Sequence, residues 1–260
     1  MSDYYEKALY LHERLRGKIE MRAKLPVIDL EDLSTIYTPG VAAPCRRIAE
    51  DKKEAYRYTI KNNSVAVVTD GSAVLGLGNI GPEAAMPVME GKALIFSEFA
   101  GISAWPICLD TQDKDEIIKT IRNIAPGFGG INLEDISAPR CFEIEAELQD
   151  LGIPVFHDDQ HGTAIVLLAG LINACRLQKR EVTDLNVVIN GAGAAGTAIA
   201  GFLRCIGLEN DTVCTPVKSI VVCDSKGAIH PGRKDLSEEK RALCTFTNQS
   251  KRSGSIKEVI

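Results

Sequence analysis

The chain has 260 residues, of which 45% are hydrophobic and 25% charged, with a formal net charge of -5. This composition is typical of a globular protein with one large or two modest domains. The negative charge is interspersed along the chain and argues against nucleic acid as the main partner. The chain starts without a signal-peptide pattern, and its longest apolar stretch, residues 163–175, is too short to span a bilayer. That stretch predicts a buried core helix, and no membrane partner is expected.

Eight cysteines are spread over the chain, and no two of them form a C-x-x-C pair. Most lie inside apolar patterns, where a free cysteine behaves as a small buried hydrophobic residue. A disulfide framework is not expected in a chain of this length, and a reducing compartment fits better. The sequence therefore predicts a cytoplasmic protein.

The first residues predict an amphipathic helix that stops before Pro26. Its apolar side chains recur at helical spacing, at Tyr4, Ala8, Leu11, Leu15 and Ile19. Such a stripe has to be buried, and a second subunit is a plausible partner, which favours a homodimer.

From Ser64 onward, short valine- and isoleucine-rich runs alternate with helical patterns. We expect strands over residues 64–69, 104–109, 130–133 and 153–156, and helices over 82–99, 113–123 and 139–151. Asp113 fits the N-cap of the second helix, and Gly152 fits the end of the third. Alternation of this kind with continuous apolar strands predicts an α/β fold with a parallel sheet covered on both faces.

A second α/β unit is expected after residue 160. A helix over 161–180 leads to a strand over 185–189, a glycine turn, a helix over 194–206, an extended connection over 208–218 and a strand over 219–223. A dinucleotide-binding sheet is usually built from two mononucleotide halves. This stretch supplies about one, so either the unit is unusually small or the sequence is incomplete.

Two acidic pairs are the most informative feature. Glu134-Asp135 follows one predicted strand, and Asp158-Asp159 follows the next. The carboxyl ends of parallel strands are where sites lie in open α/β sheets. Grouped carboxylates repel one another, and Mg²⁺ or Mn²⁺ removes that cost, since both prefer oxygen ligands. The alternative is two solvated loop ends.

The segment Gly191-Ala192-Gly193-Ala194-Ala195-Gly196 has the spacing G-x-G-x-x-G between a valine-rich strand and an alanine-rich helix, which predicts dinucleotide binding. The alternative is a packed glycine turn. Asp224 ends the next predicted strand, where a carboxylate can accept a hydrogen bond from a ribose 2′-hydroxyl and would repel a 2′-phosphate. NAD is therefore favoured over NADP.

Four further positions leave alternatives open. His157 and His161 are spaced for a zinc pair, but a hydrogen-bonding role is favoured. Tyr37 lies in a turn, where it is either a packed tyrosine, as composition alone favours, or an exposed phenol. Lys92 lies in an apolar helix, where it either extends its amine to solvent or has a lowered pKa and serves as a base.

Seven segments together resemble malic enzymes in their short prokaryotic-type form. They are residues 37–42 (YTPGVA), 68–81 (VTDGSAVLGLGNIG), 89–93 (MEGKA), 106–111 (PICLDT), 131–136 (INLEDI), 156–164 (FHDDQHGTA) and 190–196 (NGAGAAG). The resemblance implies a substrate and metal domain over residues 1–159 and an incomplete, Rossmann-like NAD-binding domain over 160–260. It also implies an oxidoreductase that converts malate to pyruvate and CO₂ with NAD or NADP and Mg²⁺ or Mn²⁺, as a homodimer.

The resemblance also implies residue roles. Lys92 resembles the general base for the C2-hydroxyl proton, and Tyr37 resembles the acid that protonates the enolate carbon. Glu134, Asp135 and Asp159 resemble the metal ligands, with Asp158 beside them.

The sequence departs from the family pattern in two places. Ser72-Ala73 stands where long-form members carry a malate-binding arginine, and the family's asparagine-bearing loops lie beyond Ile260. Two alternatives follow: a folded, dimerising chain without turnover, or a relative that converts malate to lactate.

Overall fold

The computed structural model describes residues 2–204 and 216–260. By its internal contacts the chain divides into two compact units, Met1–Ile136 with Glu147–Val155, and Ser137–Ala146 with Phe156–Ile260. Within the described ranges, no helix is both long and apolar enough to cross a membrane. Part of the expected connection over 208–218 lies outside these residues.

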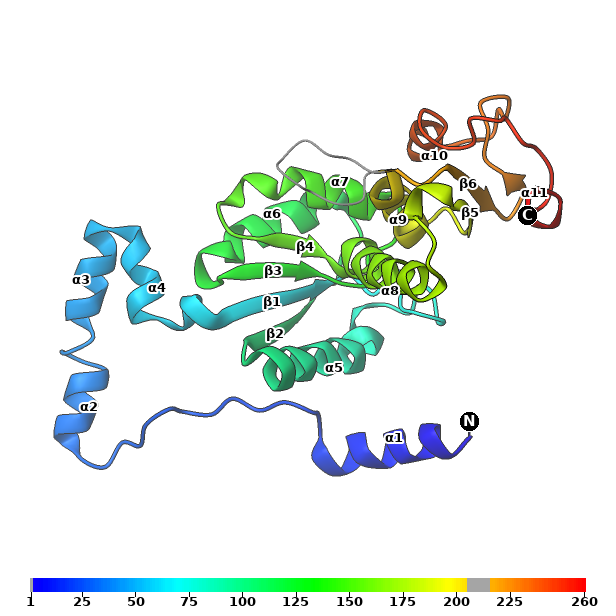
Figure 1. Cartoon of the computed structure of the whole chain (residues 1–260). Helices are drawn as coiled ribbons and strands as arrows, with labels where there is room; N and C mark the ends of the chain where they lie inside the picture. The colour runs from blue at the N-terminus through cyan, green and yellow to red at the C-terminus, as the bar shows by residue number, and fades with distance from the viewer. Residues whose placement is uncertain (1, 205–215) are drawn as a thin grey trace. The chain divides into compact units, whose positions relative to one another are not determined.

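The chain begins with four helices and continues as alternating strands and helices (Figure 1). The elements up to the end of the third strand are α1 (Ser2–Leu15), α2 (Leu30–Ile36), α3 (Ala42–Glu50), α4 (Ala55–Tyr58), β1 (Ser64–Thr69), α5 (Pro82–Ala100), β2 (Ser103–Cys108), α6 (Lys114–Ile124) and β3 (Gly130–Leu133). The later elements are α7 (Arg140–Glu147), β4 (Val155–His157), the π-helical turn η5 (Asp158–Gly162), α8 (Thr163–Gln178), β5 (Asn186–Asn190), α9 (Ala194–Arg204), β6 (Ser219–Asp224), β7 (Gly227–Ala228), α10 (Glu238–Leu243) and α11 (Ile256–Val259).

The first sheet has the strand order β2-β1-β3-β4, and β1 pairs in parallel with both β2 and β3. Ala66, Val67 and Val68 of β1 are completely buried in succession, which requires cover on both faces of the sheet. Right-handed crossovers to opposite sides of β1 place α5 and α6 on opposite faces (Figure 1). The predicted parallel sheet is confirmed.

Helix α6 shows how local sequence signals fix an element. The Asp113 side chain accepts a hydrogen bond from the Glu116 N–H at 2.9 Å, as the predicted N-cap. Ile117 and Ile121 lie one turn apart and are fully buried, so the helix packs through the face that carries them.

The second sheet contains β5, β6 and β7 in that order, with β5 and β6 parallel. Its core joins α9 to the sheet through Ile199, Ala200 and Leu203 together with Val222 of β6. The predicted strand–glycine turn–helix–strand order is confirmed for the described residues.

Two expectations about helices are wrong. The first helix ends at Leu15 rather than reaching Ile19, because Arg16 and Gly17 adopt positive φ angles of 56° and 114°, which terminate it.

Helix α8 is not the buried core helix that its composition predicts. Ala164 and Cys175 are buried, but Ile165, Val166 and Leu167 are 49%, 72% and 42% exposed. One face of α8 packs on the core of the second sheet, and apolar composition alone does not reveal how many faces are covered.

Candidate functional site

Glu134 and Asp135 follow β3, which lies between β1 and β4. The Glu134 N–H donates to the carbonyl oxygen of Val68 at 2.9 Å, and the Asp135 carbonyl accepts from the N–H of Ala73 at 2.9 Å. The two acidic residues are only 5% and 3% exposed. Asp135 has a φ of 55°, a conformation that aspartate tolerates better than most side chains. The backbone thus fixes two buried carboxylates at a strand end.

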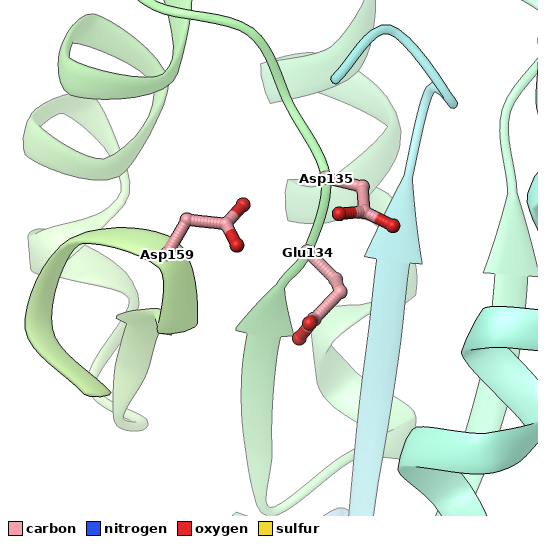
Figure 2. A group of neighbouring side chains, drawn as sticks. All are labelled: Glu134, Asp135 and Asp159. Atoms are coloured by element: carbon pink, nitrogen blue, oxygen red, sulfur yellow. The ribbon is translucent and has the colours of Figure 1, made fainter. Parts of the chain in front are cut away.

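Figure 2 shows these two side chains together with Asp159, which lies on the turn after β4. One carboxylate oxygen from each of Glu134, Asp135 and Asp159 lies within 4.8 Å of the others. Three carboxylates so close together repel one another when ionised, and a bound divalent cation reverses that cost. All the donors are hard oxygen atoms, so the group fits Mg²⁺ or Mn²⁺ better than a soft metal.

Lys92 of α5 reaches this group. Its Nζ lies 3.1 Å from Oε1 of Glu134, and the two side chains are 22% and 7% exposed. The Asn132 side-chain amide donates to the other oxygen of Glu134 at 2.8 Å. The Lys92 amine therefore ends at a buried carboxylate, so the alternative in which it extends to solvent does not describe this side chain.

The two histidines contact different carboxylates. His161 Nε2 lies 2.9 Å from Glu145 Oε2, whereas His157 Nε2 lies 3.9 Å from Asp159 Oδ2. Among the described residues, the group that could hold a metal ion consists of the three carboxylates above and includes neither histidine. The His161 contact agrees with the favoured hydrogen-bonding role, whereas 3.9 Å is too long for a hydrogen bond between His157 and Asp159.

Tyr37 lies at the C-terminal end of α2 and is not part of the carboxylate group in the described structure. Tyr37 is 66% exposed. Its N–H donates to the carbonyl of Leu33 at 3.0 Å, and its carbonyl accepts from Val41 at 2.7 Å. The main chain is therefore held in a turn, while the phenol faces outward.

The glycine turn between β5 and α9 has three glycines with different environments. Gly191 has a φ of 126°, which favours glycine. A Cβ on Gly196 would overlap the carbonyl oxygen of Gly191, so helix and strand can approach this closely only without a side chain there. A Cβ on Gly193 would meet nothing within 4 Å, which leaves open space at the start of α9. Ala192, Ala194 and Ala195 complete the turn.

Asp224 ends β6 and is surrounded by hydrogen-bond donors. Arg233 binds it through two nitrogens at 2.8 and 3.1 Å, Lys240 Nζ lies at 2.7 Å, and the Lys226 N–H donates at 2.9 Å. Burial raises the pKa of this carboxyl, but the bonds from Arg233 and Lys240 outweigh burial and hold the pKa well below its usual range. A carboxylate has about four acceptor positions. All of them are therefore in use.

A pocket of about 420 Å³ lies beside this ion pair and shares Arg233 with it. Its walls come from Pro231, Arg233, Lys234, Leu236, Arg241 and Cys244. Three of these side chains are cationic, so the pocket favours an anionic group.

Several residues of these sites escape sequence reasoning. Asn132 carries a weak signal, since it is a polar residue inside an apolar strand. Glu145, Arg233 and Lys240 carry none, because their partners are brought to them only by the fold.

Comparison with known proteins agrees with this architecture. Residues 16–149 match the family described as malic enzyme, N-terminal domain, and residues 160–260 match malic enzyme, NAD binding domain. The bifunctional malic/malolactic enzyme of Bacillus subtilis (strain 168) is 54% identical over 257 residues, which is 98% of this chain and 60% of that protein. The NADP-dependent malic enzyme of Escherichia coli (strain K12) is 46% identical over 250 residues, which is 95% of this chain and 32% of that protein.

A solved structure is also similar. The NAD-dependent malic enzyme of Thermotoga maritima superimposes with a TM-score of 0.88 at 45% identity, covering 97% of this chain and 68% of that one. The chain thus spans about 60% of one curated relative and a third of the other. Because two family matches extend over both α/β units, the chain belongs to the malic enzyme family.

Proposed function

We propose that this chain carries the metal-binding and dinucleotide-binding sites for the oxidative decarboxylation of malate to pyruvate and CO₂. The observation that carries the proposal is the group of Glu134, Asp135 and Asp159, with the Lys92 amine 3.1 Å from Glu134. We assign residues 1–159 to the substrate and metal domain and 160–260 to the NAD-binding domain.

The three carboxylates are the proposed ligands of Mg²⁺ or Mn²⁺, with Asp158 beside them. When bound, such a cation would act as a Lewis acid that polarises the C2 carbonyl of the substrate. Lys92 takes the proton of the C2 hydroxyl as the hydride leaves for the nicotinamide. Its contact with Glu134 holds the amine beside the ligand group.

Tyr37 is the proposed acid that returns a proton to the enolate carbon. Its exposure supports a role in which it completes the site of a neighbouring subunit in a homodimer. Exposed apolar residues of the N-terminal segment support the same assembly, among them Tyr5, Leu9 and Tyr10 of α1, which are 72%, 73% and 63% exposed. We place this dimer in the cytoplasm, as the cysteine usage favours.

NAD is the proposed cofactor, bound by Gly191, Gly193 and Gly196 with Asp224 at the adenosine ribose. Arg233 and Lys240 compensate the charge of Asp224, and this weakens the repulsion that a lone carboxylate would exert on a 2′-phosphate. Lys240 would have to release one acceptor position for a ribose hydroxyl to bind. We therefore propose that NADP is also accepted, with weak discrimination between the two.

The test is product formation by the 260-residue protein with malate, NAD and Mn²⁺, with metal omitted as the control. NADH and pyruvate that depend on metal support the proposal. Lactate without net NADH would favour the malolactic reaction, a specific alternative because the Bacillus subtilis relative is a bifunctional malic/malolactic enzyme. A cooperatively folded chain without turnover would favour a binding unit without catalytic activity.

A further inference from the structure

Glu145 is a buried carboxylate that the proposed chemistry does not use. It lies on α7 and is 9% exposed. Its Oε1 accepts from the backbone N–H of His157 at 3.1 Å. Its Oε2 accepts from the Gln160 amide at 3.1 Å and lies 2.9 Å from His161 Nε2. One side chain thus contacts the last residue of β4 and two residues of the turn that follows it.

These three partners bracket Asp159 in the sequence. His157 precedes the turn η5 (Asp158–Gly162), and Gln160 and His161 lie within it. We infer that Glu145 is a positioning residue that fixes this turn and thereby the direction of the Asp159 carboxylate. This inference rests on the proposed metal site, and it adds a residue that does not itself belong to the ligand group.

The turn needs such support because its geometry is unusual. π-Helical turns are rare and are frequently found at functional sites. The N–H of Thr163, which follows the turn, bonds to the carbonyl oxygens of both Asp158 and Gln160. A Cβ on Gly162 would overlap the Asp158 carboxylate, so the turn is also tightly packed. A contact on each side of Asp159 keeps the backbone of that residue in one conformation.

The chemistry of the contacts explains why a glutamate stands at this position. An ionised carboxylate only accepts hydrogen bonds, and here it serves a backbone N–H and two side chains. A glutamine has one acceptor oxygen, whereas Glu145 uses both of its oxygens as acceptors for these partners. The substitution Glu145→Gln therefore removes the acceptor for at least one of them. An aspartate keeps both oxygens but is shorter by one methylene and cannot reach the same positions from α7. Both substitutions therefore loosen the turn while leaving α7 polar at this point.

The experiment compares Glu145→Gln and Glu145→Asp with the wild-type 260-residue protein. The matched control is Glu147→Gln, which removes the same charge from an exposed position of the same helix. Mn²⁺ affinity is measured by electron paramagnetic resonance, which reports free Mn²⁺ directly. Residues that orient metal ligands typically change metal affinity about 10- to 100-fold. We expect a weakening in this range for both Glu145 variants and no change for the control.

A second readout separates positioning from general support of the fold. Hydrogen–deuterium exchange should rise in peptides covering residues 157–162 of the Glu145 variants, while α9 and β6 remain protected. A uniform rise over the whole second unit, or unchanged Mn²⁺ affinity in well-folded variants, would overturn the inference. If the wild-type protein binds no Mn²⁺, the proposed metal site fails, and unchanged exchange in the turn would separately overturn the role of Glu145.

Discussion

The strands β3 and β6 each lie beside a parallel neighbour and each have acidic residues at their carboxyl end, yet these carboxylates have opposite electrostatic surroundings. At the end of β3, two buried acidic residues join Asp159 in a group whose oxygens lie within 4.8 Å. At the end of β6, Asp224 is bound by the side chains of Arg233 and Lys240, and Arg233 also binds Asp235. The first site concentrates negative charge, whereas at the second site nearby arginine and lysine side chains compensate the charge of Asp224.

This difference separates two functions that the sequence presents in the same way, as an acid at a strand end. A group of carboxylates gains stability from a cation supplied from solution, which is the property of a metal site. A carboxylate already saturated by arginine and lysine gains nothing from a metal, and instead holds those cations where an anionic ligand can meet them. The following predictions test this contrast, beginning with the largest expected effect.

Lys92→Arg should retain a cation beside Glu134 but remove the base, because arginine does not lose its proton in proteins. General-base catalysis contributes about 10²- to 10⁴-fold, so the turnover of malate should fall by that factor. Mn²⁺ affinity should stay within a few-fold of wild type. The initial rate of NADH formation checks this, with exposed Lys119→Gln as the control. Undiminished turnover would remove Lys92 from the chemistry.

Gly196→Ala and Gly193→Ala should separate folding from cofactor binding at the glycine turn. The methyl group of the first overlaps the Gly191 carbonyl, and overpacking of this kind costs about 1–3 kcal/mol. The second methyl meets no protein atom, so the free energy of unfolding should stay within about 1 kcal/mol of wild type. The methyl group of Gly193→Ala would still obstruct a bound pyrophosphate. Urea denaturation measures the stability of each variant, and NAD titration measures its cofactor affinity. Equal effects of the two variants on stability and on affinity would contradict the assignment of this turn to cofactor binding.

Asp224→Asn should change how stability depends on pH. The pKa of Asp224 is lowered in the folded state, so its stabilising effect is complete above the unfolded pKa of about 3.9 and is lost as pH falls toward the folded value. Hydrogen bonds to charged groups contribute about 1.5–3 kcal/mol, which is the expected loss at pH 7. The difference from wild type should shrink below about pH 4. Urea midpoints against pH test this, with exposed Asp184→Asn as the control.

Lys240→Gln should raise the preference for NAD over NADP. The substitution removes a cation available to a 2′-phosphate and frees one acceptor position of Asp224 for a ribose hydroxyl. We expect the ratio of the two dissociation constants to shift about three- to tenfold toward NAD. Lys226→Gln is the matched control, since that amine pairs with Asp235. A shift toward NADP would show that Lys240 acts mainly by neutralising Asp224.

Local signals made much of the fold predictable. The apolar run of β1 and the N-cap Asp113 each act within a few residues, and the structure agrees with them. Gly152 ends a short 3-10 turn over Gln149–Leu151, since α7 already ends at Glu147. The three carboxylates were predictable because parallel strands bring their ends to one edge of the sheet. The exposure of α8 was not predictable, since burial depends on neighbouring elements rather than on composition. The roles of Glu145, Arg233 and Lys240 were not predictable either, because they contact partners 9–16 residues away in the sequence through side-chain contacts that have no sequence pattern.

The most direct test of the metal site at the end of β3 is a Mn²⁺ titration of the wild-type protein and Asp135→Asn, followed by electron paramagnetic resonance. Asp110→Asn, an exposed acid beyond the end of β2, is the control. The account predicts one tight Mn²⁺ per chain in the wild type and in the control, and its loss in Asp135→Asn. Equal binding by all three proteins, or none by the wild type, would contradict it.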